Sequence, residues 1–548
     1  MNKKYIVGGL IFWAGVSGYM GLRILESYTE DAVFAALSAV PAQAQEIRYS
    51  FLSNTLTLKG VEYELPDDRI MHKGTIESVE VKGFNRKCMF VKPDMPPYDP
   101  DALPIVAESI TATGITDSVH VGHTKAEQKV DSVQLTGWYQ RLGMLLDQRS
   151  QHGGKASYFE ELYRCRLDGL EISNVKTLIS EADQPSMNFG IARIALAEGI
   201  RAPRGGEKVP PVSLTVSGIQ VGGKYFSGAL QGFTVSRALA PEPAVLEEIL
   251  RLTSDTLGAD RKNVYGSPLE EIITQISALM QKNYENSLPF SRISLQGGDL
   301  KAVQRVTANG NMQENFFSAS LKGFDCALAM PQEGAIKNTI TLSGLKIGIP
   351  QNMGLGIPAV LERYTPGGFT INASSESVTS DTEMSGRALY ELVGLGSLEC
   401  ELDLLGDMRA LQTVMVDGDP SGSAEELMQS IRLKKLNVVY KDSGLLPMGV
   451  EVMARWHFDE PESLLAEIFA TLKMFGQSPE RPVQELCTAL TEQFTMPGEF
   501  RMTMAPQQPV NAAEILALAS ADPDALPVSF SSKPGAKALK DYLPGGQK

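Results

Sequence analysis

The stretch LTLKGV, residues 56–61, carries the pattern from which the fold class of this chain follows. Leu56 and Leu58 are apolar, the residue between them is polar, and Gly60 is followed at once by Val61. A period of two is typical of a strand with one buried face, and a glycine within such a strand favours a bulge or a positive φ. The stretch therefore predicts one strand of a half-buried, curved antiparallel sheet.

The same apolar-x-apolar-x-Gly-apolar pattern recurs along the chain. Its nine fair copies contain Gly60, Gly83, Gly114, Gly137, Gly169, Gly199, Gly218, Gly323 and Gly344, and degenerate copies surround Gly232, Gly297 and Lys435. In the first half the glycines are 14 to 32 residues apart, which indicates a loose repeat of strand-and-return units rather than a strict solenoid. The alternative is that a large antiparallel protein produces such motifs by chance.

Helical periodicity is confined to a few segments. Residues 244–252 and 268–281 interrupt the β pattern, and the second has a proline in its first turn. Three further amphipathic helices are predicted near the end, over 463–475, 482–494 and 511–520. The fold class expected is mainly β with α additions (α+β).

These changes of pattern divide the chain into six predicted parts. They are a transmembrane anchor and stalk (1–41), a first β-repeat region (42–241), a helical insertion (242–288), a second β region (289–456), a C-terminal helical cap with short strands (457–526) and a flexible tail (527–548).

The N-terminus has the composition of a membrane helix. Residues 5–22 contain no charged side chain, and 18 helical residues approach the roughly 30 Å thickness of a bilayer core. Lys3 and Lys4 precede the run, so the positive-inside rule predicts a cytoplasmic N-terminus and a body across the membrane. A cleaved signal peptide, with a small-x-small site at 42–44, and a buried core helix are the alternatives.

The amino-acid composition argues against several classes of partner and site. Its 548 residues carry a formal net charge of -15, which argues against nucleic acid, because a polyanion needs a dense Lys/Arg face. The five cysteines are spread singly, without the CxxC spacing of zinc or redox sites. Cys88 and Cys165 are the best candidates for a disulfide, and an odd number leaves at least one free thiol in an oxidising compartment.

No constellation of residues indicates catalysis. His120 and His123 are three apart, so on a strand they point to opposite faces and suit one metal poorly. The segment 418–424 (GDPSGSA) lacks the frame of a nucleophile elbow, and no phosphate-binding glycine motif occurs. We therefore expect no enzyme activity, no metal and no cofactor.

Several segments together resemble a known family. They are the N-terminal apolar run, TLTLKGVEY (55–63) with the β units that end in Gly-apolar, KKLNVVYKDSGL (434–445), and PGEFRMTMAPQQPV (497–510) followed by a helix and ADPDALPVSFSS. The chain is similar to AsmA-like and uncharacterised proteobacterial envelope proteins anchored in the inner membrane. The resemblance implies a periplasmic β body with a role in envelope maintenance, through a β groove that shields lipid tails. It supplies no catalytic residues.

The alternation defines a candidate binding surface. The apolar positions of the glycine-ended strands are Leu56, Leu58, Val79, Val81, Val133, Leu135, Leu214, Val216, Ile340 and Leu342. If helices cover only part of this face, it offers a cleft for lipid acyl chains or an envelope partner. The alternative is a closed core, which would make the chain a structural or assembly scaffold without a ligand.

Overall fold

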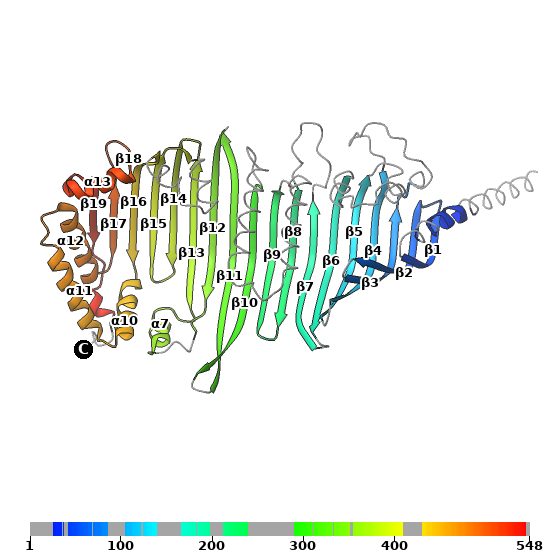
Figure 1. Ribbon diagram of the computed structural model, residues 1–548, viewed down its shortest axis with the longest axis horizontal. Helices are drawn as coiled ribbons and strands as arrows, with labels where there is room; N and C mark the ends of the chain where they lie inside the picture. The colour runs from blue at the N-terminus through cyan, green and yellow to red at the C-terminus, as the bar shows by residue number, and fades with distance from the viewer. Residues whose placement is uncertain are drawn as a thin grey trace, which may run out of the picture. The chain divides into compact units, whose positions relative to one another are not determined.

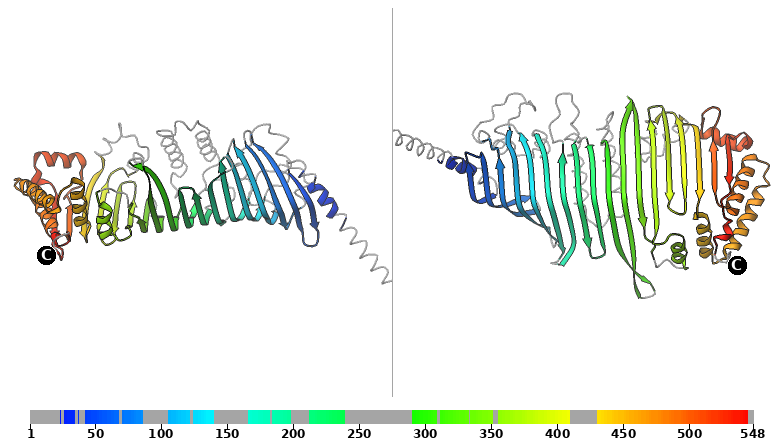
Figure 2. Two further views of the ribbon diagram at one scale, coloured as in Figure 1. Left: turned by 90° about the horizontal axis from the view of Figure 1, so that it is seen from below. Right: turned by 180° about the vertical axis from the view of Figure 1, so that it is seen from behind.

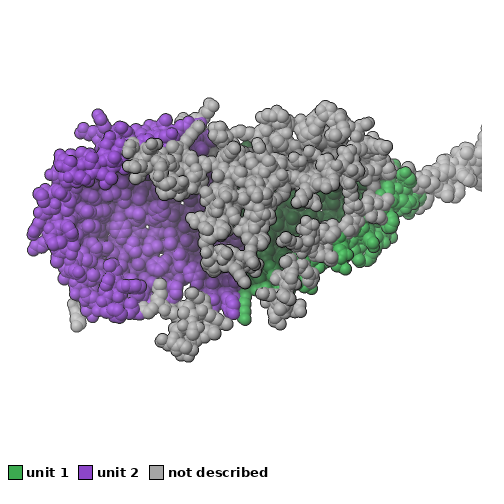
Figure 3. All heavy atoms as spheres, in the orientation of Figure 1, with its two compact units in different colours: residues 1–224, 232–254 green, residues 225–231, 255–548 purple. Residues whose placement is uncertain are grey.

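A computed structural model describes most of the chain. The described residues are 23, 26–34, 37, 42–67, 70–85, 105–121, 124–139, 166–181, 184–197, 212–238, 290–308, 311–332, 334–350, 355–408 and 430–543. The chain divides into two compact units (Figure 3). Unit 1 comprises residues 1–224 and 232–254, and unit 2 comprises residues 225–231 and 255–548.

Unit 1 is an antiparallel sheet in which each strand pairs with the next along the chain (Figure 1). A helical segment at residues 26–34 precedes it. The strands are β1 (Ala42–Ser50), β2 (Thr55–Asp67), β3 (Ile70–Lys82), β4 (Ile105–Val121), β5 (Thr124–Tyr139), β6 (Arg166–Glu181), β7 (Gln184–Ala197) and β8 (Val212–Gly223), and β9 (Phe226–Ala238) contributes residues to both units.

Unit 2 continues the strand pattern and adds helices. It contains β10 (Arg292–Ala308), β11 (Asn311–Gln332), β12 (Ala335–Ile347), α7 (Ile357–Tyr364), β13 (Phe369–Thr379), β14 (Glu383–Leu392), β15 (Gly396–Leu405), β16 (Arg432–Asp442), α10 (Leu445–His457), α11 (Pro461–Phe475), α12 (Arg481–Thr495), β17 (Glu499–Met504), β18 (Val510–Asn511), α13 (Ala512–Ala521) and β19 (Val528–Lys533), with short 3-10 turns at Pro523–Ala525 and Leu539–Asp541. Strands β10 to β17 pair antiparallel in chain order, and β17 then pairs with β19 (Figure 2).

The prediction of a mainly β fold with helical additions is confirmed. Among the described residues, no helix is both long enough and apolar enough to cross a bilayer. The predicted anchor at 5–22 and the two predicted helices at 244–252 and 268–281 lie outside the described residues. The three helices expected near the C-terminus are confirmed as α11, α12 and α13.

Most repeat glycines have the positive φ that the sequence predicts. Gly60, Gly83, Gly114, Gly137, Gly218 and Gly344 lie between φ 56° and 64°, and Gly297 of a degenerate copy has φ 53°. Gly169 and Gly323 are not left-handed, so the prediction is wrong for these two, and Gly199 lies outside the described residues. The left-handed region favours glycine because it has no Cβ.

The strand ladder continues without a bulge at Gly60 but shifts at Gly344. Ala44 pairs with Val61 and Glu46 pairs with Lys59, so the β1–β2 register continues unchanged past Gly60. A bulge would instead set two residues of one strand against one of the other. The expectation of a bulge is therefore wrong at Gly60, where only the positive φ remains. At Gly344 the register between β12 and β13 shifts between Leu342 and Leu345, as a bulge requires.

In strands β1 to β8, the alternation of apolar and polar residues shifts by one residue at a single row across the sheet, which we call the glycine row. In β2 the apolar positions are Leu58 and then Val61, and in β4 they are Ala112 and then Ile115. The row that they skip contains Gln45, Gly60, Glu77, Gly114, Asp131, Asn174, Ala192 and Gly218, one from each strand in register. Since all strands shift at the same row, one face stays apolar on both sides of it.

Helices with glutamates cover the outer edge of a strand in each unit. In unit 1, Glu26 and Glu30 accept the backbone N–H groups of Phe51 and Tyr49 at 2.9 and 2.7 Å. In unit 2, Glu485 of α12 accepts the N–H of Phe530 in β19 at 3.3 Å. Unpaired N–H groups on an edge strand are a template for aggregation, and these carboxylates satisfy some of them.

The C-terminal region differs from the sequence analysis in two places. Residues 445–456 were expected within a β region, but α10 covers 445–457, because the Asp442 carboxylate accepts the N–H groups of Leu446 at 2.8 Å and Gly444 at 3.1 Å. This bonding explains the Asp of the KDSGL segment, and the φ of 151° at Gly444 explains its Gly. The tail expected to be flexible from 527 instead contains β19, and Leu539 and Leu543 pack in a core cluster with Val450 and Leu465.

A second, small helix was also not predicted. α7 begins after Gly356, which has φ 69°, and its Arg363 donates to both carboxylate oxygens of Glu451 in α10 at 3.0 Å. Glu451 is only 1% exposed. A charge buried so deeply needs a partner, so this ion pair fixes α7 against α10.

Candidate functional site

Two apolar rows cross unit 1 at right angles to its strands. In the first row each residue pairs with the next across the sheet: Leu56, Val81, Ile110, Leu135, Leu170, Leu196 and Leu214. The second row is formed in the same way by Leu58, Val79, Ala112, Val133, Ile172, Ile194 and Val216. Because direct cross-strand partners lie on the same face, each row is a continuous strip of apolar side chains.

The register brings together the predicted face residues of unit 1. Leu56, Val81, Leu135 and Leu214 belong to the first row, and Leu58, Val79, Val133 and Val216 to the second. Ile340 and Leu342 lie on β12 of unit 2, where Ile340 pairs with Cys326 and Leu342 with Phe324.

A third apolar row lies beyond the glycine row. It consists of Val61, Ile76, Ile115, Val130, Val175, Ile191 and Ile219. These residues were not predicted as part of the binding face, although the apolar residue after each repeat glycine was a signal for some of them. From the usual spacings along and between strands, the three rows cover roughly 17 Å by 29 Å.

The cover over these rows changes along the sheet. Near β1 to β4, Leu56 and Val81 are buried in a cluster with Val33 of the helical segment, and Leu37 packs against it. Towards β8, Leu214 and Val216 are only half-buried. The helical segment therefore seals one end of the rows.

A depression of about 680 Å³ lies at the same end of unit 1. It is lined by Phe34, Leu37, Ala42, Gln43, Ala44, Glu62, Tyr63, Glu64, Lys73, Gly74 and Thr75. The Tyr63 ring crosses Gly74, and its hydroxyl donates to Asp117 at 3.2 Å. Burial, followed by the Asp117 charge and hydrogen bond, raises the pKa of Tyr63 to about 12. This tyrosine is a protonated donor at neutral pH.

The chemistry-bearing residues of the sequence give no catalytic arrangement within the described residues. No three His, Cys, Asp or Glu side chains gather there in a metal-binding group. His120 is in β4, whereas His123, Cys88 and Cys165 lie outside the described ranges. Burial and the bond to Asp442 raise the pKa of Tyr440, which lies on β16 just before α10.

Comparison with known proteins gives limited information. The profile of a family described as "Uncharacterized protein" matches residues 390–533, which extend from the end of β14 to the last residue of β19. No curated protein matches the chain significantly. The match falls in unit 2, so the apolar rows of unit 1 lie outside it.

Proposed function

We propose that this chain is a non-enzymatic, AsmA-like envelope protein that binds lipid acyl chains along the three apolar rows. The observation that carries the proposal is the continuity of these rows over β2 to β8, with half-buried side chains towards β8. Acyl chains bind mainly by burying apolar surface and need few directional contacts, and these rows provide such a surface. The rows extend about 29 Å across the strands, which is about twice the 15 Å thickness of one leaflet of a bilayer core. An extended acyl chain is therefore shorter than the rows.

The proposal includes a location. The uncharged run at 5–22 after Lys3 and Lys4 supports a single-pass anchor in the inner membrane, with a cytoplasmic N-terminus and a periplasmic body. A reporter that fluoresces only in the cytoplasm, fused after Lys548, is then dark. Bright fusions contradict the orientation, and a mature N-terminus at Gln45 contradicts the anchor.

A closed scaffold is the second candidate function. The cluster of Val33 with Leu56 and Val81 favours it, because there the chain covers its own apolar face. A scaffold would recruit an envelope partner through its surface and would carry no lipid.

Photocrosslinking in cells separates the two functions. Val216 and Thr215 are neighbours on β8 and point to opposite faces, so they form a matched pair. With the photoreactive residue p-benzoylphenylalanine at position 216, we expect lipid adducts by mass spectrometry, and at position 215 none. Adducts only to the chain itself at 216 support the scaffold, and equal lipid labelling at both positions contradicts a specific face.

A charge in the rows provides a second test. Val216→Asp should reduce the lipid that co-purifies with the full chain, and Thr215→Asp should not. Val81 is less suitable for this change, because it is only 8% exposed and a carboxylate there would disrupt the fold.

A further inference from the structure

An unusual pair of lysines lies on the other face of unit 1. Lys129 of β5 and Lys176 of β6 are direct cross-strand partners, and they alternate with Val130 and Val175 of the third apolar row. Like charges placed directly opposite each other destabilise a sheet. Within the described part of the chain, neither lysine has an ion pair or a hydrogen bond from its ammonium group.

Several other cations of unit 1 have carboxylate partners. Lys59 lies 3.3 Å from Glu46, Lys82 lies 3.3 Å from Glu80, and Arg193 forms two bonds to Glu171. Lys73 and Arg237 of unit 1 likewise have no carboxylate partner among the described residues. What distinguishes Lys129 and Lys176 is that they are direct cross-strand partners of each other.

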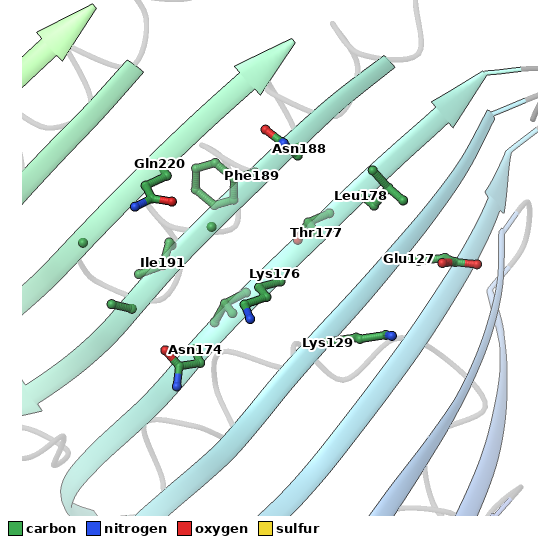
Figure 4. Close-up of a pocket in the computed structure, with 14 residues that line it drawn as sticks. Glu127, Lys129, Asn174, Lys176, Thr177, Leu178, Asn188, Phe189, Ile191 and Gln220 are labelled. Atoms are coloured by element: carbon green, nitrogen blue, oxygen red, sulfur yellow. The ribbon is translucent and has the colours of Figure 1, made fainter. Parts of the chain in front are cut away.

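A depression of about 500 Å³ adjoins the two lysines (Figure 4). Its floor is formed where β7 and β8 carry the small residues Gly190, Ala192 and Gly218. Asn188 and Gln220 line it from the same two strands, and within the described residues no hydrogen bond joins their side-chain amides to a partner. The two lysines line the side of the depression formed by β5 and β6, and the two amides line the side formed by β7 and β8 (Figure 4).

The acids near this depression already have partners. Glu127, which also lines it, is ion-paired with Lys125 at 2.5 Å. Asp131, two residues from Lys129, accepts a hydrogen bond from Asn174 at 2.8 Å. Neither acid is placed directly opposite a lysine of the pair, because Glu127 pairs with Leu178 and Lys129 with Lys176.

We propose that Lys129 and Lys176 bind a phosphate group between them, at the β5–β6 side of this depression. A phosphate dianion would remove the repulsion between the two ammonium groups and accept charge-assisted hydrogen bonds from both. The shared chemistry is that of a phosphomonoester, either free in solution or in the headgroup of a lipid. This site does not depend on the apolar rows, since it lies on the opposite face.

The test is titration calorimetry on the full chain in a nonionic detergent at low ionic strength. One arm uses inorganic phosphate, and the other uses dihexanoyl phosphatidic acid, with dihexanoyl phosphatidylcholine as its control. We expect binding in at least one arm, weakened by salt and lowered about tenfold or more in Lys129→Gln/Lys176→Gln. The stronger arm identifies the source of the phosphate.

Lys59→Gln/Lys82→Gln is the matched control, because it removes two charges from the same unit. It should bind as the wild type does. Thermal unfolding supplies a second measurement: phosphate or phosphatidic acid should raise the Tm of the wild type and of the control but not of Lys129→Gln/Lys176→Gln. Absence of binding in both arms, or equal loss in the control, overturns the proposal.

Discussion

Alanine at Gly344 should destabilise the protein by about 1–2 kcal/mol more than alanine at Gly323, because a left-handed conformation costs a non-glycine residue about that much. The two glycines belong to copies of the same repeat on neighbouring strands, β11 and β12. Gly344 has φ 58°, whereas Gly323 is not left-handed. Both changes lower the conformational entropy of the unfolded chain equally, so that contribution cancels in the difference.

Steric contacts act in the same direction as the backbone conformation. A Cβ on Gly344 would meet Cδ, Cγ and Cβ of Lys322 at 2.6, 2.8 and 3.2 Å, and the last two atoms lie too close to the backbone of β11 to move away freely. A Cβ on Gly323 would lie 3.6 Å from the carbonyl oxygen of Leu295, which is an ordinary contact. The backbone conformation accounts for about 1–2 kcal/mol of the expected loss, and the contact with Lys322 adds to it.

Urea unfolding followed by far-UV circular dichroism measures the two free energies of unfolding. Gly344→Asn is an informative third variant, since Asn54 and Asn174 adopt positive φ in this protein, and it should cost less than alanine. Equal destabilisation by Gly344→Ala and Gly323→Ala would refute the role that we assign to the positive φ.

Three further predictions concern single side chains. The Tyr63 pKa of about 12 exceeds the usual value of about 10, so the stability that the neutral phenol provides is complete below pH 10 and is lost as pH rises towards 12. In Asp117→Asn the pKa of Tyr63 should fall, which phenolate absorbance measures with Tyr63→Phe as the blank. Asp442→Ala should cost about 1–2 kcal/mol in urea unfolding, because α10 loses the acceptor for two N–H groups at its start; an unchanged midpoint would contradict the capping role. Glu26→Ala/Glu30→Ala should promote self-association, detected by light scattering, because the N–H groups of Phe51 and Tyr49 lose their acceptors; Glu62→Ala/Glu64→Ala on paired strand β2 is the control and should stay unassociated.

The sequence by itself predicted features that depend on neighbouring residues along the chain. The alternation of Leu56 and Leu58 before Gly60 was enough to predict a strand and a positive φ, because side-chain period and backbone sterics are local properties. The same reasoning found α11 to α13, whose apolar and polar faces alternate with helical period. It failed for α10, because Pro447 and Gly449 lie within that helix and the acceptor at its start comes from the strand before it.

Only the tertiary structure decided which residues meet across the sheet. Gly169 and Gly323 have the repeat sequence without the positive φ, so the motif does not fix the backbone of every copy. The alignment of Leu56 with Val81, and of Lys129 with Lys176, depends on strand register. Register is set by returns of variable length and by the packing of whole faces, and these long-range terms are absent from any short stretch of sequence.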